Sequence, residues 1–224
     1  NQVTLLRYLI KYRKTQSPDL PRELGGFIEA MGTLIAEVEK STLTDLETAR
    51  PLLMGIEGRA AHHYWEAVRR LVAVGDGWPG RRGRGATDPL NAALNYAYGI
   101  LYGQIERAIV LAGLDPYAGF VHADRPGKPS LVLDLIEEFR AAAADRPVFA
   151  LFNRGTRVEV DEQRLLTQDS RRAIAQAVLE RLDSTERYER KRVPLRHVIQ
   201  TQARHMATFL RGERPEYQPF LARY

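Results

Sequence analysis

The sequence predicts an all-α fold, with a single helical domain over residues 1–224, on three observations. Apolar residues recur at helical spacing over most of the chain. Start and stop signals frame these segments: Asp88-Pro89 supplies an N-cap and a first-turn proline, and glycines follow several expected helix ends. Only residues 148–155 and 157–166 have strand-like character, so at most one small hairpin is expected there.

Two longer loops are expected among the connections between the helices, one at 75–88 and a structured one, rich in Pro and Gly, at 114–129. Leucines alternate with basic residues at the start of the chain, which predicts a linker-type helix within 1–17. Residues 75–88 contain five glycines and three arginines and are expected to form a flexible basic loop, flanked by long helices. The further helices are expected at about 21–40, 44–74, 89–112, 130–144 and 195–211, and one ends near 182 after a cap at Thr167 or Asp169.

The composition excludes several classes of protein. Apolar residues make up 44% and charged residues 27% of the chain, which is typical of a folded domain and not of a disordered one. The absence of cysteine excludes disulfides, zinc–thiolate sites and cysteine nucleophiles. No apolar run is long enough for a membrane helix and no signal peptide is recognisable, so a cytoplasmic protein is expected. The net charge of +5 suits a nucleic-acid partner, although a solvated basic surface is the commoner cause.

Glu57 is the first candidate for a functional residue. It shares a face of its expected helix with apolar side chains such as Leu53 and Tyr64, so its carboxylate is expected to point inward. A buried carboxylate needs a cation or hydrogen-bond donors to compensate the loss of water. A metal ion could supply that charge, but so could an ion pair with Arg59 or Arg69.

A second set of candidates lies between residues 120 and 140. His122 lies in a loop, and Asp134, Glu137 and Glu138 share one side of the following helix. Two neighbouring carboxylates repel each other and are more stable beside a metal ion. An ordinary acidic helix face with a histidine bonded to the backbone explains the same pattern, and periodicity does not choose between Asp134 and Glu137 as a ligand.

Basic residues gather in three groups along the chain. A flexible basic loop can settle on phosphate groups with little geometric demand, whereas a solvated charge run is the usual role of such a group. His62, His63, His197 and His205 have no assigned role. The three groups are Lys11, Arg13 and Lys14; Arg81, Arg82 and Arg84; and Arg187, Arg190, Lys191, Arg192 and Arg196.

Four segments together resemble a known family. They are IEGRAAHHYW (56–65), the stretch from DPLNAALNYAYG to GLDPYAGFVH (88–122), GKPSLVLDLIEEFR (127–140) and the closing residues 199–224. In this order they are similar to the CRISPR-associated spacer-acquisition integrases, the Cas-one family. The resemblance covers most of the chain and is specific, because several distinctive segments occur in the right order.

The resemblance implies a metal site and a set of DNA contacts. Its ligands fall on Glu57, His122 and Glu137, with Asp134 as a second-shell or alternate ligand. The implied metal is Mg²⁺ or Mn²⁺, which suits two carboxylates and one imidazole. Residues expected to touch DNA are Arg59, Tyr98 and Lys128 from the resemblance, and Arg81, Arg82 and Arg84 from the basic loop.

The function expected from the resemblance is that of a metal-dependent DNA endonuclease and integrase. Such an enzyme uses a DNA 3′-OH to attack a phosphodiester and so inserts a short duplex, the spacer precursor, into a CRISPR repeat. The expected partners are DNA and a Cas-two protein, and the full-length protein is expected to be a homodimer. The resemblance also implies an N-terminal β-domain, which is expected to be absent from residues 1–224. A non-catalytic helical DNA-binding or assembly module is the alternative, and a helical hydrolase of small substrates is a third reading.

Overall fold

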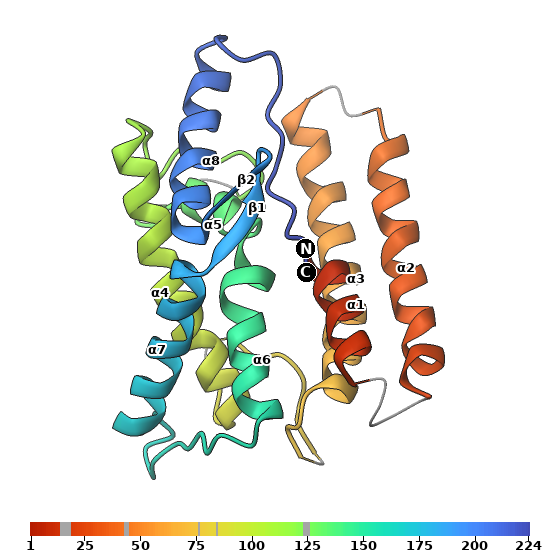
Figure 1. Ribbon diagram of the computed structural model, residues 1–224. Helices are drawn as coiled ribbons and strands as arrows, with labels where there is room; N and C mark the ends of the chain where they lie inside the picture. The colour runs from red at the N-terminus through yellow and green to blue at the C-terminus, as the bar shows by residue number, and fades with distance from the viewer. Residues whose placement is uncertain (14–18, 43–44, 76, 84, 123–125) are drawn as a thin grey trace. The chain divides into compact units, whose positions relative to one another are not determined.

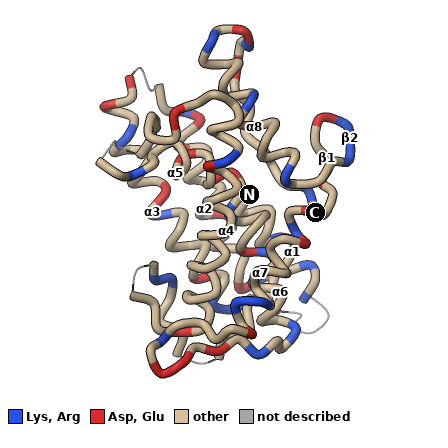
Figure 2. The backbone as a smooth tube through the Cα atoms, turned by 90° about the vertical axis from the view of Figure 1, so that its left-hand side faces the viewer, with Lys and Arg blue, Asp and Glu red and all other residues tan. Residues whose placement is uncertain are grey.

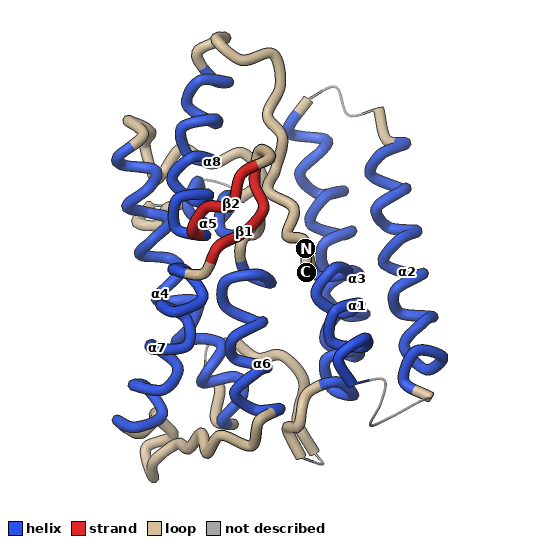
Figure 3. Tube along the Cα trace, in the orientation of Figure 1, coloured by secondary structure: helices blue, strands red, loops and turns tan. Residues whose placement is uncertain are grey.

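The computed structural model of the protein describes residues 1–13, 19–42, 45–75, 77–83, 85–122 and 126–224. Helices dominate these residues, and the strands among them form one two-stranded hairpin (Figures 1 and 3). The prediction of an all-α fold is therefore confirmed. No helix in this part of the chain is both long and apolar enough to cross a membrane.

The described chain forms two compact units that meet in sequence inside the basic loop 75–88. The described residues of this loop contain no helix or strand. The single domain expected over 1–224 stays a prediction. The N-terminal unit comprises Gln2–Arg81 and Tyr224, and the C-terminal unit comprises Asn1 and Arg82–Arg223.

Three helices make up the N-terminal unit: α1 (Gln2–Arg13), α2 (Leu20–Lys40) and α3 (Leu46–Leu71). Each lies against the other two, and Figure 1 shows α2 alongside α3. α1 is the helix expected within 1–17, and the end of that range, from residue 14, lies outside the described residues. After α3 the chain is anchored by the buried side chain of Trp78, whose carbonyl oxygen accepts a hydrogen bond from Arg69 at 2.5 Å.

The C-terminal unit is built around α4 (Pro89–Leu111), which lies against the other helices of the unit. α4 begins where the sequence predicts, because the Asp88 carboxylate accepts a hydrogen bond from the Asn91 amide at 2.9 Å. The other elements are α5 (Ser130–Ile136), the π-helix η1 (Arg140–Asp145), α6 (Arg146–Asn153), α7 (Gln168–Asp183), β1 (Thr185–Tyr188), β2 (Lys191–Pro194) and α8 (Leu195–Leu210).

The segment from 130 to 155 differs from the prediction in two ways. The helix expected over 130–144 is interrupted after Ile136, and the chain continues through a turn into the π-helix. The strand expected at 148–155 is wrong, because most of that segment belongs to α6. Val148 and Phe149 are buried on this short helix, so its apolar run serves helix packing rather than a sheet. In the range 157–166 only a single bridge joins Val160 to Leu166.

The hairpin lies at 185–194, about thirty residues after its predicted place. Its strands pair antiparallel around a two-residue turn, Glu189 and Arg190, which both have positive φ angles, 46° and 65°. Hydrophobic periodicity does not predict β1, because its buried residue is the charged Glu186. Its carboxylate forms a buried ion pair with Arg181 of α7 and lies 3.9 Å from Arg146.

We expect the Arg181–Glu186 pair to be essential for the stability of the C-terminal unit. Replacing Arg181 by Met leaves a buried carboxylate without its main partner, which costs about 3–5 kcal/mol of unfolding free energy. Breaking the exposed pair of Arg196 and Asp183 by Arg196→Met should cost less than about 1 kcal/mol. Urea unfolding followed by circular dichroism measures both values. Equal losses in the two variants contradict this role of the buried pair.

Candidate functional site

The carboxylate of Asp134 organises the loop that carries His122. It accepts hydrogen bonds from three consecutive backbone amides, those of Phe120 at 2.5 Å, Val121 at 3.1 Å and His122 at 3.0 Å. It also lies 2.7 Å from the Nδ1 atom of the His122 ring. All these partners belong to the C-terminal unit, so the Asp134 side chain fixes residues 120–122 to α5.

This arrangement determines which nitrogen of His122 carries the hydrogen. An ionised carboxylate can only accept hydrogen bonds, so Nδ1 must be the donor. In the neutral ring the Nε2 atom then has its lone pair available for a metal ion or a proton. A histidine that ligates a metal commonly has this form, with a carboxylate behind the ring.

The same loop is tied to the beginning of α5 by Ser130. The hydroxyl of Ser130 accepts a hydrogen bond from the Gly119 amide at 3.0 Å and donates one to the Tyr117 carbonyl oxygen. A Cβ atom at Gly119 would lie 2.6 Å from the Ser130 Cβ, so only glycine allows this close approach. The position of His122 therefore rests on contacts at both Ser130 and Asp134.

Glu137 lies in the turn between α5 and the π-helix, in a cluster that the sequence did not predict. Its carboxylate forms an ion pair with Arg140 at 2.5 Å. The guanidinium of Arg140 lies over the ring of Tyr98, 5.2 Å from its centroid, and the Tyr98 hydroxyl donates to the Asp145 carboxylate at 2.6 Å. Tyr98, expected near the site, is thus linked to Glu137 through Arg140. Only the i, i+3 spacing of Glu137 and Arg140 could have signalled part of this cluster.

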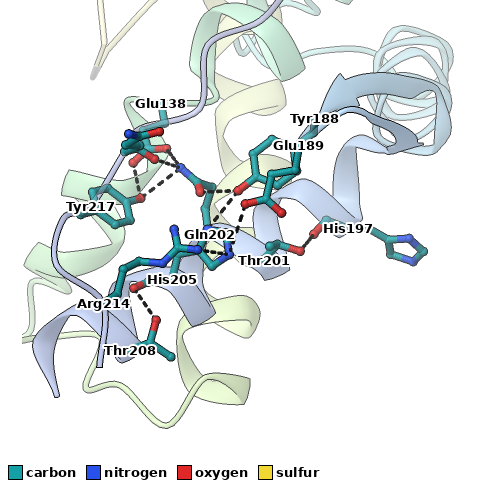
Figure 4. Close-up of polar contacts among 11 residues, drawn as sticks. Glu138, Tyr188, Glu189, His197, Thr201, Gln202, His205, Thr208, Arg214 and Tyr217 are labelled. Carbon is teal, nitrogen blue, oxygen red and sulfur yellow. Dashed lines mark hydrogen bonds and ion pairs between the residues drawn. The ribbon is translucent and has the colours of Figure 1, made fainter. Parts of the chain in front are cut away.

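Glu138, the next residue, has different partners from Glu137 and holds the C-terminal segment (Figure 4). Its carboxylate accepts hydrogen bonds from the Tyr217 hydroxyl, and from the Gln202 side chain and the Phe220 amide, both at 2.8 Å. Burial raises the pKa of Glu138, and these three donors lower it in part. The ring of Phe220 stacks on Phe139 with centroids 5.2 Å apart. The turn that carries Glu137 is therefore held by residues far along the chain.

Glu57 departs from its predicted orientation. It lies on α3 in the N-terminal unit and is exposed, whereas Ile56 beside it is buried. The prediction of an inward-facing carboxylate is wrong, because the packed face of α3 runs through Ile56 and Tyr64. The alternative of an ion pair with Arg59 or Arg69 is wrong as well. Their partners are the acids Glu37 and Glu66.

The remaining predicted residues are spread over both units. Arg59 is exposed on α3, and Lys128 is half-buried just before α5. Arg81 lies with its guanidinium 5.7 Å from the ring centroid of Trp65, and Arg82 is exposed. Arg84 lies outside the described residues.

The predicted metal ligands come from different units. His122 and Glu137 belong to the C-terminal unit and Glu57 to the N-terminal one. Among the described residues, no three His, Asp or Glu side chains form a cluster that could hold a metal ion. The trio of Glu57, His122 and Glu137 therefore stays a prediction.

Comparison with known proteins identifies the family. The family described as "CRISPR associated protein Cas1" matches residues 1–180. The chain belongs to the Cas1 family. A CRISPR-associated endonuclease Cas1 of Archaeoglobus fulgidus is 37% identical over 235 residues, which cover all of this chain and 68% of that relative. The Cas1 endonuclease of Hyperthermus butylicus is 38% identical, over 99% of this chain and 64% of its own length.

Solved structures share the fold of this Cas1 chain at lower identity. A casposase bound to its integration product has a TM-score of 0.72 at 23% identity, covering 97% of this chain and 63% of that one. A Cas1 protein from Thermotoga maritima has a TM-score of 0.72 at 22% identity, covering 95% and 69%. A Cas6-RT-Cas1–Cas2 complex gives 0.76 at 19% identity, covering 98% and 24%. The chain thus spans about two thirds of these two curated Cas1 relatives and 24% of the chain in the Cas6-RT-Cas1–Cas2 complex.

We expect Tyr217→Phe to destabilise the C-terminal unit, because it removes one hydrogen bond from the half-buried Glu138 carboxylate. A hydrogen bond to a charged group contributes about 1.5–3 kcal/mol. Tyr102→Phe is the matched control, since it removes a hydroxyl from α4 outside this network. Urea unfolding of both variants tests the expectation. An equal effect of the two substitutions contradicts a specific role of the Tyr217 hydroxyl.

Proposed function

We propose that this chain is the catalytic part of a divalent-metal-dependent DNA endonuclease and integrase that inserts short duplexes into a CRISPR array. The observation that carries the proposal is the His122 ring, oriented by the Asp134 carboxylate, in a chain of the Cas1 family. The relatives named as Cas1 endonucleases, and the casposase captured with an integration product, support this activity.

The proposed metal ligands are Glu57, His122 and Glu137. Two carboxylates and one imidazole are a mostly oxygen-rich donor set, which suits Mg²⁺ or Mn²⁺. The Nε2 atom of His122 fits this role, because Nδ1 is already bonded to Asp134. A bound ion would supply Lewis-acid stabilisation of charge on the scissile phosphate.

The other residues of the site position these ligands. We assign Asp134 to orienting His122, because its two oxygens are already occupied by four donors. Arg140 balances the charge of Glu137 and is itself held over Tyr98. The protein's main contributions are then orientation and electrostatics around the reacting phosphate.

The proposed reaction joins two DNA strands without an external energy source. The 3′-oxygen of a short duplex forms a new bond to phosphorus, and the broken strand leaves with a free 3′-OH. With water as nucleophile the same site cleaves DNA. The proposed DNA contacts are Arg59, Arg81, Arg82, Arg84, Lys128 and Tyr98. The proposed protein partners are a Cas2 protein and a second copy of the full-length protein. The Cas6-RT-Cas1–Cas2 complex supports the Cas2 partner.

Removing any proposed ligand should abolish the chemistry while leaving the fold intact. We expect Glu57→Ala, His122→Ala and Glu137→Gln each to lose metal-dependent joining of a short duplex to supercoiled DNA by at least about a hundredfold. The assay is run with and without a Cas2 partner, and circular dichroism checks the fold.

Glu47→Ala is the matched control for Glu57→Ala, because it removes another exposed carboxylate from α3. Full activity in any well-folded variant shows that the replaced residue is not a metal ligand. A wild-type chain that binds DNA but neither binds Mn²⁺ nor cuts DNA is instead a non-catalytic DNA-binding module.

Replacing Asp134 should weaken metal binding through His122. We expect Asp134→Asn to raise the Kd for Mn²⁺, measured by electron paramagnetic resonance, about 10–100-fold. Asp115→Asn is the control, because Asp115 also accepts a hydrogen bond from a backbone amide of this loop, that of Tyr117 at 2.9 Å, but contacts no histidine. Unchanged Mn²⁺ affinity in a folded Asp134→Asn variant contradicts the orienting role.

A further inference from the structure

The hairpin β1–β2 carries two arginines directly opposite each other. In its antiparallel register Arg187 of β1 faces Arg192 of β2, and both are exposed. Like charges in directly opposite positions destabilise a strand pair. Arg192 donates a hydrogen bond at 3.3 Å to the neutral hydroxyl of Thr185. The fold itself therefore gives no reason for this pair of cations.

The cations of the hairpin are not paired with acids in the part of the chain that the structure describes. Four basic residues of the hairpin form no ion pair with a described residue: Arg187, Arg190, Lys191 and Arg192. Arg196, just after β2, differs in this respect, because it pairs with Asp183 at 2.5 Å. Figure 2 shows basic colouring (blue) along the hairpin and acidic colouring (red) near its turn.

Both acids of the hairpin are directed to the protein. Glu186 is buried against Arg181, and Glu189 lies 3.7 Å from the Nε2 atom of His205 (Figure 4). Tyr188 also points inward, and its hydroxyl donates to the Gln202 side chain at 2.8 Å. Successive side chains of a strand point to opposite faces, so these inward residues leave Arg187 on the outer face.

The turn keeps charged residues where glycine or asparagine is favoured. Glu189 and Arg190 have φ angles of 46° and 65°, which side chains other than Gly, Asn and Asp seldom adopt. Backbone strain of this kind occurs preferentially where function requires it. Here these φ angles form the tight turn between β1 and β2. The cations on the outer face therefore project from a short hairpin whose inner face is packed against the protein.

We propose that this hairpin is a phosphate-binding element that contacts the backbone of duplex DNA through Arg187 and Arg192, with Arg190 and Lys191 at the adjoining end. Two neighbouring guanidinium groups can each bind a phosphate oxygen pair in the planar, two-point geometry that arginine favours. The anion relieves the repulsion between them. Such contacts hold DNA without reading its sequence. The inference rests on the proposed function, because it takes DNA as the partner.

The test compares duplex binding at several salt concentrations by fluorescence anisotropy. The variant is Arg187→Gln with Arg192→Gln, and its control is Arg171→Gln with Arg172→Gln, which removes two exposed charges from α7. We expect the hairpin variant to bind a duplex on the order of tenfold or more weakly than wild type near 0.1 M salt. The slope of log affinity against log salt concentration should be smaller in magnitude by roughly 2 in this variant than in wild type. This corresponds to about one for each lost phosphate contact.

A second measurement separates binding from folding. Without DNA, the hairpin variant should melt at the same temperature as wild type or slightly above it, because the repulsion between the arginines is gone. Replacing both arginines by lysine should keep the salt dependence of wild type, because lysine retains the charge.

Three outcomes overturn the inference. The first is wild-type affinity and salt dependence in the hairpin variant, and the second is an equal loss in the α7 control. The third is a hairpin variant that binds DNA normally but no longer assembles with a Cas2 protein, which would assign the hairpin to an acidic protein surface. A wild-type chain that binds no duplex at all overturns the proposed function together with this inference.

Discussion

The carboxylate of Asp134 is the constraint on which the candidate site depends. Three backbone amides in succession, from Phe120 to His122, point toward it, and each would lose a hydrogen bond if it were absent. These residues are half-buried, and a fully buried amide without a partner costs about 1–3 kcal/mol, so the three bonds together favour this shape of the loop. The same carboxylate fixes the ring of His122. The side chain that shapes the loop is therefore also the one that orients its histidine.

Irregular helix geometry gives the second constraint. After Ile136 the chain leaves the α-helix, passes Glu137 and Glu138 in a turn, and continues as a π-helix. Neighbouring carboxylates that would repel each other are separated by this turn into two environments. Glu137 pairs with Arg140, and Glu138 binds donors near the C-terminus. π-Helical insertions occur often at functional sites, where they reorient single side chains.

Local signals were enough to predict much of the fold. The limits of α4 follow from Asp88, which caps its first turn, and from Gly113, whose φ of 75° ends it. The signals failed where an element depends on distant partners. The charged strand β1 exists because Arg181 neutralises the inward-facing Glu186, and hydrophobic periodicity cannot register such a strand.

Only part of the candidate site was predictable, because its contacts also join residues that are distant in sequence. The family resemblance gave His122 and Asp134, but their contact joins residues twelve positions apart and follows from no helical or strand spacing. Glu57 was misjudged because its apolar neighbours along α3 do not all face the core, as the exposed Met54 shows. Glu138 accepts hydrogen bonds from Gln202 and Phe220, and no local sequence pattern predicts contacts between residues so far apart.

The tautomer of His122 shows directly whether Asp134 orients its ring. Long-range proton–nitrogen correlation spectra of the protein labelled with ¹⁵N-histidine distinguish Nδ1–H from Nε2–H in a neutral ring, and His122→Gln identifies the signal. We predict the Nδ1–H form in the wild-type protein, and the other tautomer or a mixture of both in Asp134→Asn. A neutral His122 that carries its hydrogen on Nε2 in the wild-type protein would contradict the central claim.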